Sequence, residues 1–230
     1  MDKLVIILLI FCSASILSAQ FPVQCLSAAQ GQALCDTNLG NRKTIPEEIK
    51  SQVLNALSCY PELKESKIIF QFRNRITPLS TRPRLMGLIR KRKQRTYIIT
   101  ISKNTIKQIR PILFKNLPYN AQIGVLGHEL AHLVEFNNKT SFQLIRLFFK
   151  KFKSSNTDRF EFNTDLACIN HGLGFQLFDW SKYVRESLQI KEWKGAASDG
   201  NAEKLNQRYM NPETINLYIK KNDLYMSIRN

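Results

Sequence analysis

The sequence predicts an α+β protein in which a small mixed β-sheet is followed by a helical C-terminal half. Runs rich in β-branched and aromatic residues lie between residues 67 and 102 and are typical of strands. From residue 119 onward, apolar residues recur at helical spacing instead. Because 43% of the residues are hydrophobic and no repeat or low-complexity linker interrupts residues 44–230, we expect one packed domain there.

Residues 1–19 have the pattern of a secretory signal peptide. A short charged start precedes an apolar stretch from Leu4 to Leu17, and small residues ending at Ala19 mark the expected cleavage position. The stretch is shorter than the about 20 apolar residues of a membrane span, although an uncleaved N-terminal anchor is the alternative. The sequence therefore predicts export, either to a periplasm or out of the cell.

Residues 20–43 are expected to form a cysteine-containing extension over the domain. Export would leave four of the five cysteines in an oxidising compartment, where they can pair. Cys25 with Cys35 would staple the extension, and Cys59 with Cys168 would tie an early helix to a later one. Alternatively, Cys168 is a buried thiol in an apolar helix.

The domain is expected to begin with a helix, because Thr44–Glu48 combines a capping residue, a proline and two acids, and Tyr60 and Pro61 end the pattern. Three strands are expected next, at Lys67–Arg73, Arg84–Arg90 and Arg95–Ser102. The last two would form a hairpin with a basic tip. A helix follows that residues 117–122 introduce and residues 136–139 end, and further helices are expected at 141–153, around 161, at 175–189 and towards 217.

The most informative motif is His128-Glu129-Leu130-Ala131-His132, inside an apolar helical run. Residues four apart on a helix share a face, with Cβ atoms about 5–6 Å apart, so His128 and His132 can direct imidazole nitrogens at one metal ion. Glu129 projects about 100° around the helix, where it could take a proton from water on that metal. An ordinary amphipathic helix is disfavoured because the chain has only three histidines.

A catalytic zinc site has three protein ligands and leaves a fourth position to water. The extended pattern HExxHxxGxxH is excluded because position 135 is Glu and position 138 is Asn. The best third ligand is Glu161, because Asp165 follows it by four residues and could accept the free N–H of a ligating imidazole. Asp158 and Glu135 are fallback ligands. The alternative for Glu161 and Asp165 is that both lie on a solvated helix face and bind no metal.

Together, HExxH at 128–132 and Glu161-x-x-x-Asp165 resemble the motifs of gluzincin-type zinc metallopeptidases, over about residues 67–174. The resemblance implies a zincin-like single domain at 44–230, with the sheet packed on the HExxH helix. It implies His128, His132 and Glu161 as Zn²⁺ ligands, Glu129 as general base and Asp165 as the partner of a ligating histidine.

The resemblance also implies a peptide or protein substrate that lies extended along an edge strand. That edge is expected around Tyr97–Ile101 or Leu85–Ile89. A further residue is needed to stabilise the developing oxyanion. Four residues of suitable type are available, and the sequence does not choose among them: Tyr209, Arg208, Tyr183 and His171.

The formal charge of +16 predicts attraction to anionic partners. Acidic substrates and an anionic envelope or membrane surface are the expected classes, and residues 141–153 are either a basic amphipathic helix on such a surface or a helix packed on the core. Nucleic acid is not expected, because export argues against it, and the oligomeric state is not decided by the sequence.

The sequence thus predicts an exported zinc-dependent metalloendopeptidase. The alternative is an exported binding or assembly protein, in which the zinc site is vestigial or structural. In that case the basic surface would contact a membrane, a glycan or a protein partner.

Overall fold

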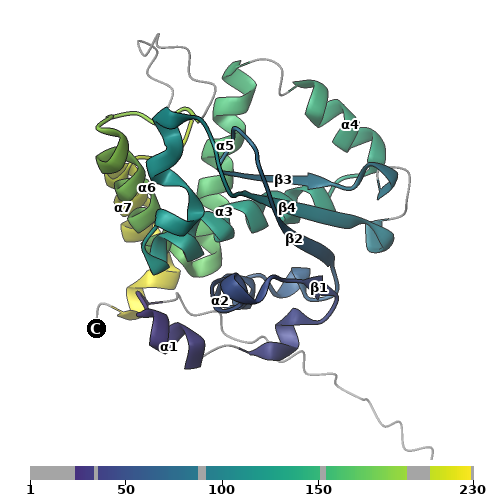
Figure 1. The fold of residues 1–230 in the computed structure, drawn as a ribbon, viewed down its shortest axis with the longest axis horizontal. Helices are drawn as coiled ribbons and strands as arrows, with labels where there is room; N and C mark the ends of the chain where they lie inside the picture. The colour runs from purple at the N-terminus through teal and green to yellow at the C-terminus, as the bar shows by residue number, and fades with distance from the viewer. Residues whose placement is uncertain (1–23, 34–35, 88–91, 151–153, 196–207, 229–230) are drawn as a thin grey trace, which may run out of the picture.

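The computed structural model describes residues 24–33, 36–87, 92–150, 154–195 and 208–228 (Figure 1). The predicted signal peptide with its cleavage position and Cys35 lie outside these ranges, as do residues 88–90 of the strand expected at Arg84–Arg90. Among the described residues, no helix is both long and apolar enough to span a bilayer.

Four strands form one mixed sheet in the order β1-β2-β4-β3. Their bounds are Lys43–Thr44 for β1, Lys67–Arg73 for β2, Leu79–Pro83 for β3 and Thr96–Ser102 for β4. Strands β1, β2 and β4 are parallel, whereas β3 pairs with β4 in the antiparallel direction. β4 is central and buried from its second residue to its last, as expected for a strand covered on both faces.

The expected strand at Arg84–Arg90 is wrong. Its described part contains a 3₁₀ turn, Leu85–Gly87, in which Leu85 is 75% and Met86 62% exposed. The hairpin partner of β4 is instead β3, where Leu79 pairs with Ile101. Pro83 is tolerated at the end of this strand because β3 is an edge of the sheet and needs no further amide there.

The edge expected for substrate is corrected in the same way. Residues 97–101 belong to the central strand β4, and residues 85–87 form a turn. The edge of the sheet that packs beside the HExxH helix is β3.

Seven α-helices and nine short helices complete the described chain. The α-helices are α1 (Ala28–Ala33), α2 (Lys50–Ser58), α3 (Tyr119–Asn137), α4 (Ser141–Lys150), α5 (Ser154–Cys168), α6 (Gly174–Leu188) and α7 (Pro212–Lys221). The 3₁₀ helices are η1 (Thr37–Gly40), η2 (Glu47–Ile49), η3 (Pro61–Leu63), η4 (Leu85–Gly87), η5 (Arg92–Gln94), η6 (Lys107–Ile112), η7 (Phe114–Asn116) and η9 (Asp223–Ile228), and η8 (Ile169–Leu173) is π-helical. This mixture of helices with one small sheet agrees with the α+β class.

Helix α3, which carries HExxH, is the centre of the molecule. It packs against α2, α5, α6 and β3 (Figure 1), and its middle is buried on all sides, which explains why that stretch is apolar around its whole circumference. Two glycines permit the close approach of its neighbours. A Cβ at Gly124 would lie 2.1 Å from the carbonyl oxygen of Gln176, and one at Gly127 would lie 2.5 Å from Leu173 Cδ1.

The chain passes from α5 to α6 through η8. Gly172 has a φ of 90° there, which glycine adopts readily, and it marks a kink between the two helices. No disulfide bond joins two described cysteines. Cys168 is fully buried, as in the buried-thiol interpretation, and burial raises the pKa of the Cys59 thiol to about 12.

Candidate metal centre

The two histidines of the motif lie one turn apart on α3 and face α5. Nε2 of His128 lies 3.2 Å from Oε2 of Glu161, and Nε2 of His132 lies 3.1 Å from the same oxygen. All three side chains are buried, and their ligand atoms lie within 4.8 Å of one another. This group could hold a metal ion, and it is the one such group of three among the described residues.

Hydrogen bonds from α5 fix the orientation of both imidazoles. Nδ1 of His128 lies 2.7 Å from Oδ1 of Asp165, and Nδ1 of His132 lies 3.2 Å from Oγ1 of Thr164. The Thr164 hydroxyl donates to the carbonyl of Phe160, so it accepts from the histidine. Both Nδ1 atoms therefore carry a proton, and the two Nε2 atoms, which face Glu161, are the positions left to bind a metal ion.

Asp165 is fully buried, and both of its oxygens are used. Oδ1 accepts from His128, and Oδ2 accepts from the backbone N–H of Met210 at 2.7 Å. Burial lowers the pKa of His128, but its hydrogen bonds to Asp165 and Glu161 and their charges outweigh burial and raise that pKa to about 10. A metal ion that binds here therefore displaces a proton.

Glu129 lies beside this group rather than within it. Its side chain reaches a pocket that His128 also lines, and the residue is 6% exposed. Among the described residues, its Oε2 atom is buried without a hydrogen-bond partner. Because an unpaired buried acceptor is costly, this oxygen is positioned to accept a proton from a molecule bound in the pocket.

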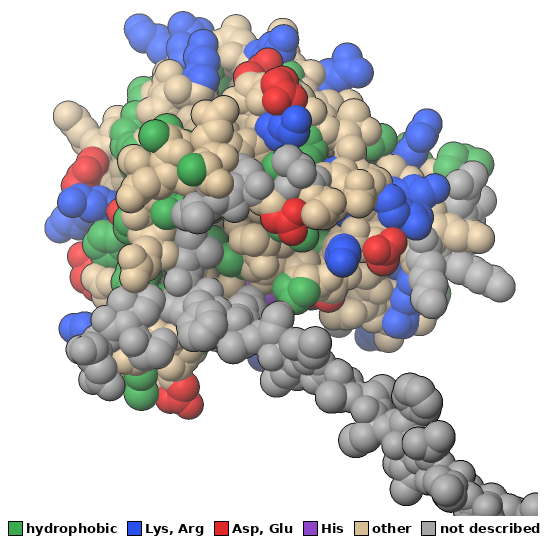
Figure 2. Space-filling model, turned by 90° about the horizontal axis from the view of Figure 1, so that it is seen from below, with side chains coloured by type: hydrophobic (Ala, Val, Ile, Leu, Met, Phe, Trp, Pro, Cys, Tyr) green, Lys and Arg blue, Asp and Glu red, His purple; other side chains and the backbone are tan. Residues whose placement is uncertain are grey.

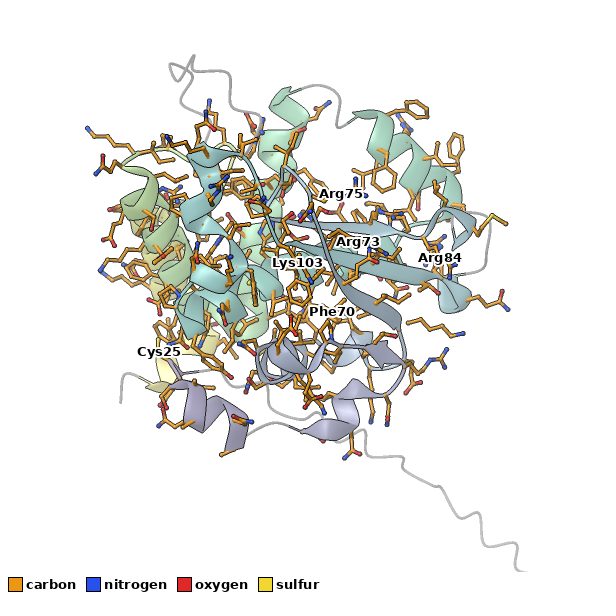
Figure 3. The ribbon with its side chains drawn as sticks, in the orientation of Figure 1. Cys25, Phe70, Arg73, Arg75, Arg84 and Lys103 are labelled. Atoms are coloured by element: carbon orange, nitrogen blue, oxygen red, sulfur yellow. The ribbon has the colours of Figure 1, made fainter. Side chains whose placement is uncertain are left out.

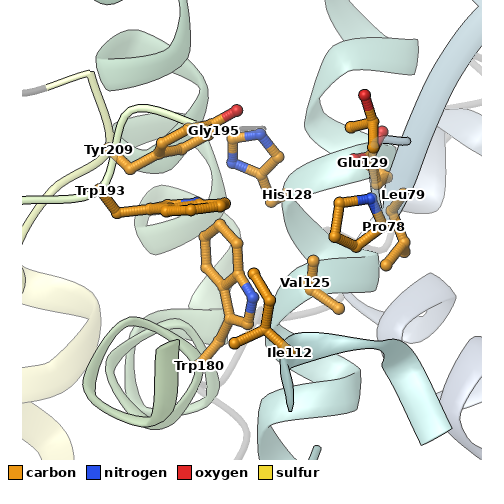
Figure 4. A pocket seen from close by; sticks show the side chains of 11 residues that line it. Pro78, Leu79, Ile112, Val125, His128, Glu129, Trp180, Trp193, Gly195 and Tyr209 are labelled. Atoms are coloured by element: carbon orange, nitrogen blue, oxygen red, sulfur yellow. The ribbon is translucent and has the colours of Figure 1, made fainter. Parts of the chain in front are cut away.

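The pocket is a small, mostly apolar cavity of about 40 Å³, enough for one or two water molecules (Figure 4). Figure 4 shows Trp180, Trp193 and Tyr209 on one side of His128, and Pro78 and Leu79 from the β3 edge near Glu129. The remaining lining residues are Thr77, Ile112, Val125 and Gly195. The described lining contains no lysine or arginine, so the positive charge of the chain lies elsewhere.

Of the four candidates for oxyanion stabilisation, Tyr209 alone lines this pocket. Its ring centroid lies 5.5 Å from that of His128. Burial raises the pKa of Tyr209, and the charges of Glu161 and Glu129 raise it further, so the hydroxyl keeps its proton and can donate a hydrogen bond.

The other three candidates have structural contacts. The Tyr183 hydroxyl donates to the carbonyl of Asn116, and the His171 ring stacks on Tyr60 with centroids 4.3 Å apart. Arg208 donates from Nε to Asp158 at 2.6 Å.

The fallback metal ligands do not reach the site. Asp158 is paired with Arg208, and Glu135 lies 3.2 Å from Lys139 one turn along α3. Thr164 was not among the residues predicted from the sequence, although it lies three residues after Glu161 and therefore on the same helix face. The two tryptophans of the pocket had no signal in the sequence, because they reach it through tertiary packing.

Comparison with protein-family models, with curated proteins and with solved structures found no match for this chain. The function proposed below therefore depends on the geometry of the site and on the pattern of residues that forms it.

Proposed function

We propose that this protein is an exported, zinc-dependent metalloendopeptidase with a zincin-like fold. The observation that carries the proposal is the position of Glu129. Its partly unsatisfied, buried carboxylate lies in the same pocket as His128, beside a group of three residues that could hold a metal ion. One of the three candidate ligands, His128, and the candidate base Glu129 therefore line the same small cavity.

The ligand set suits zinc. Two neutral imidazoles and one carboxylate are common zinc ligands, and ligand atoms about 2.0–2.1 Å from a tetrahedral ion lie about 3.3 Å apart. The distances of 3.2 and 3.1 Å from Glu161 Oε2 to the two Nε2 atoms agree with that value. Three protein ligands leave one tetrahedral position for water or substrate, which is the pattern of a catalytic rather than a structural site.

A zinc ion held there would supply Lewis-acid polarisation of the scissile carbonyl and of the attacking water. Glu129 would accept a proton from that water at Oε2 and return it to the leaving amine. The Tyr209 hydroxyl, which remains protonated, would donate to the developing oxyanion. Leu79, the first residue of the edge strand β3, lines the pocket together with Thr77 and Pro78 just before it, so an extended peptide added beside β3 would reach the site.

Metal content tests the ligand set first. Elemental analysis after exhaustive dialysis should give about one zinc per chain for the parent and little for Glu161→Ala. The matched control is Glu135→Ala, which removes an acid from α3 that is paired with Lys139 and should keep its zinc. Equal zinc in the Glu161 variant and the parent would contradict the assignment.

Peptide hydrolysis tests the reaction. Incubation of the zinc-loaded protein with a mixed peptide library, followed by mass spectrometry, should show cleavage by the parent. Glu129→Gln should retain zinc and lose about 10²- to 10⁴-fold in rate, because the amide cannot accept the proton. A zinc-loaded parent that cleaves nothing would instead favour the exported binding or assembly protein.

Export is tested by the N-terminus of the protein recovered from its native cell envelope or medium. Mature protein should begin at Gln20, directly after the expected cleavage position. An N-terminus at Met1 in a soluble cytosolic fraction would contradict export.

A further inference from the structure

Helix α4 has apolar side chains on two opposite faces, and the core covers one of them. Leu144 is fully buried, and Phe148 packs on Phe136 with ring centroids 5.6 Å apart. On the other side Phe142 is 73% exposed and Ile145 41%, and Phe149, at 69%, continues the same face at i, i+3, i+7 spacing. Packing on the core thus explains half of the apolar residues of this helix.

Two more exposed apolar residues lie at the same end of the molecule. Leu85 and Met86 form the turn η4, whose backbone at Arg84 donates to the carbonyl of Thr96. The adjacent Arg95 is 2% exposed and reaches the hydroxyl of Ser141, the first residue of α4. The start of β4 therefore links η4 to α4, and we call the exposed side chains of both elements the α4 surface: Leu85, Met86, Phe142, Ile145 and Phe149.

The charge around the α4 surface has one sign. Arg84, Arg92 and Arg146 are exposed beside it, and Figure 3 places Arg84 at the end of the sheet nearest α4. No Asp or Glu occurs between Glu65 and Glu129, so all the formal charge in that part of the sequence is positive. Figure 2, seen from the side of α1 and α2, shows that lysine and arginine side chains also lie along parts of the rim of that other face, with acidic side chains among them.

We propose that the α4 surface docks the protein on an anionic lipid bilayer. Exposed phenylalanine and aliphatic side chains on a helix, flanked by arginines, match the amphipathic helices that lie in the headgroup region. Association with a second copy through this surface is disfavoured, because it would bring like charges together.

Docking would also place the pocket near the bilayer. Strand β3 runs from Pro83, next to η4, to Leu79, which lines the pocket, a distance of about 13 Å along an extended strand. The docking surface is independent of the proposed peptidase activity, because it shares no side chain with the metal group. If both hold, polypeptides at the membrane surface are the substrates within reach.

Depth-dependent quenching tests the contact directly. The chain has two tryptophans, Trp180 and Trp193, which are 8% and 7% exposed. Subtracting the emission of the parent, measured with the same vesicles, therefore isolates the signal of a third tryptophan placed at an exposed position. Phe142→Trp should show a blue-shifted emission and strong quenching by vesicles of phosphatidylglycerol and brominated phosphatidylcholine. Leu217→Trp on α7, where Leu217 is 48% exposed, is the matched control and should be quenched little.

The tryptophans at positions 142 and 217 are compared in the same full-length chain. An apolar N-terminal segment that bound lipid would therefore not by itself produce the difference in quenching between the two positions. Equal quenching at positions 142 and 217, or none at 142, would overturn the proposal.

Charge and salt give a second test. In the Phe142→Trp protein, the additional substitution Arg146→Glu should weaken vesicle binding about tenfold. Without that substitution, salt at about 0.5 M should weaken vesicle binding by the Phe142→Trp protein. Binding of similar strength to vesicles of phosphatidylcholine alone would overturn the anionic specificity. Light scattering should give a monomer without lipid, and a dimer that Phe142→Ala dissociates would assign the α4 surface to a second copy instead.

Discussion

Replacing Asp165 with asparagine should damage zinc binding although the side chain keeps its size. Both oxygens of Asp165 accept hydrogen bonds at 2.7 Å, one from His128 Nδ1 and one from the backbone N–H of Met210. An amide can accept at only one of these positions, because its other end is a donor. Either orientation of the asparagine amide therefore places two donors against each other in a fully buried location.

The two orientations have different costs. If the amide nitrogen faces Met210, a buried donor is left unsatisfied, which costs about 1–3 kcal/mol of folding free energy. If the nitrogen faces His128, the imidazole must move its proton to Nε2, and the lone pair needed for zinc is lost. In both cases the carboxylate charge that strengthens the imidazole as a ligand is removed, so we expect zinc affinity to fall about 10- to 100-fold, or about 1.4–2.7 kcal/mol.

Competition with a chromophoric chelator measures this affinity, and thermal unfolding with and without zinc measures the folding cost. The matched control is Asp158→Asn, on the same helix, where the carboxylate is also buried but is paired with Arg208. That variant should lose stability and keep its zinc affinity within about twofold. A folded Asp165→Asn protein that binds zinc as tightly as the parent would refute the assigned role of Asp165.

Three further predictions concern the surroundings of the site. Thr164→Val, nearly isosteric, should weaken zinc binding by up to about tenfold in the same chelator assay, because His132 loses its Nδ1 acceptor. Gly124→Ala should lower the melting temperature by at least about 2 °C, because the new methyl group meets the backbone of α6 and overpacking costs about 1–3 kcal/mol or more. An unchanged melting temperature would contradict that close packing. The pKa of His171 is lowered by burial but raised overall by its hydrogen bond to Glu62. The pKa of Glu62 is raised by burial but lowered overall by the same hydrogen bond. His171 therefore contributes stability at pH values below its unfolded pKa of about 6.5, and Glu62 contributes stability at pH values above its unfolded pKa of about 4.5. The melting temperature of the parent should exceed that of His171→Phe most between these two pH values. The difference should shrink at higher and at lower pH.

The parts of the site that depend on local geometry could be predicted from the sequence. His128 and His132 share a face because any helix places residues four apart together, and Glu161 and Asp165 follow the same rule. That these two helices face each other is a tertiary fact. It depends on close packing around α3, and the sequence indicated it only through resemblance to a known pattern.

The strands β2 and β4 could be predicted from the sequence, whereas β3 could not, because interior and edge strands differ in apolar content. β2 and β4 are interior strands, so their apolar content is high and visible in the sequence. β3 is an edge strand with Ser80, Thr81 and Arg82 at its centre, and its pairing with β4 decides its structure. The apolar residues Leu85 and Met86, which suggested a strand, are exposed instead. Their hydrophobicity carries information about the surface rather than about the sheet.

Three consecutive residues, Arg208, Tyr209 and Met210, contact Asp158, the pocket and Asp165 respectively. The contact between Met210 and Asp165 spans 45 residues of sequence. In a chain synthesised from its N-terminus, both metal-bearing helices emerge well before this segment arrives. The histidine–carboxylate pair is therefore held in its final orientation late in biogenesis. If the chain is exported and hydrolytic as proposed, this order would delay full competence until most of the polypeptide has crossed the membrane.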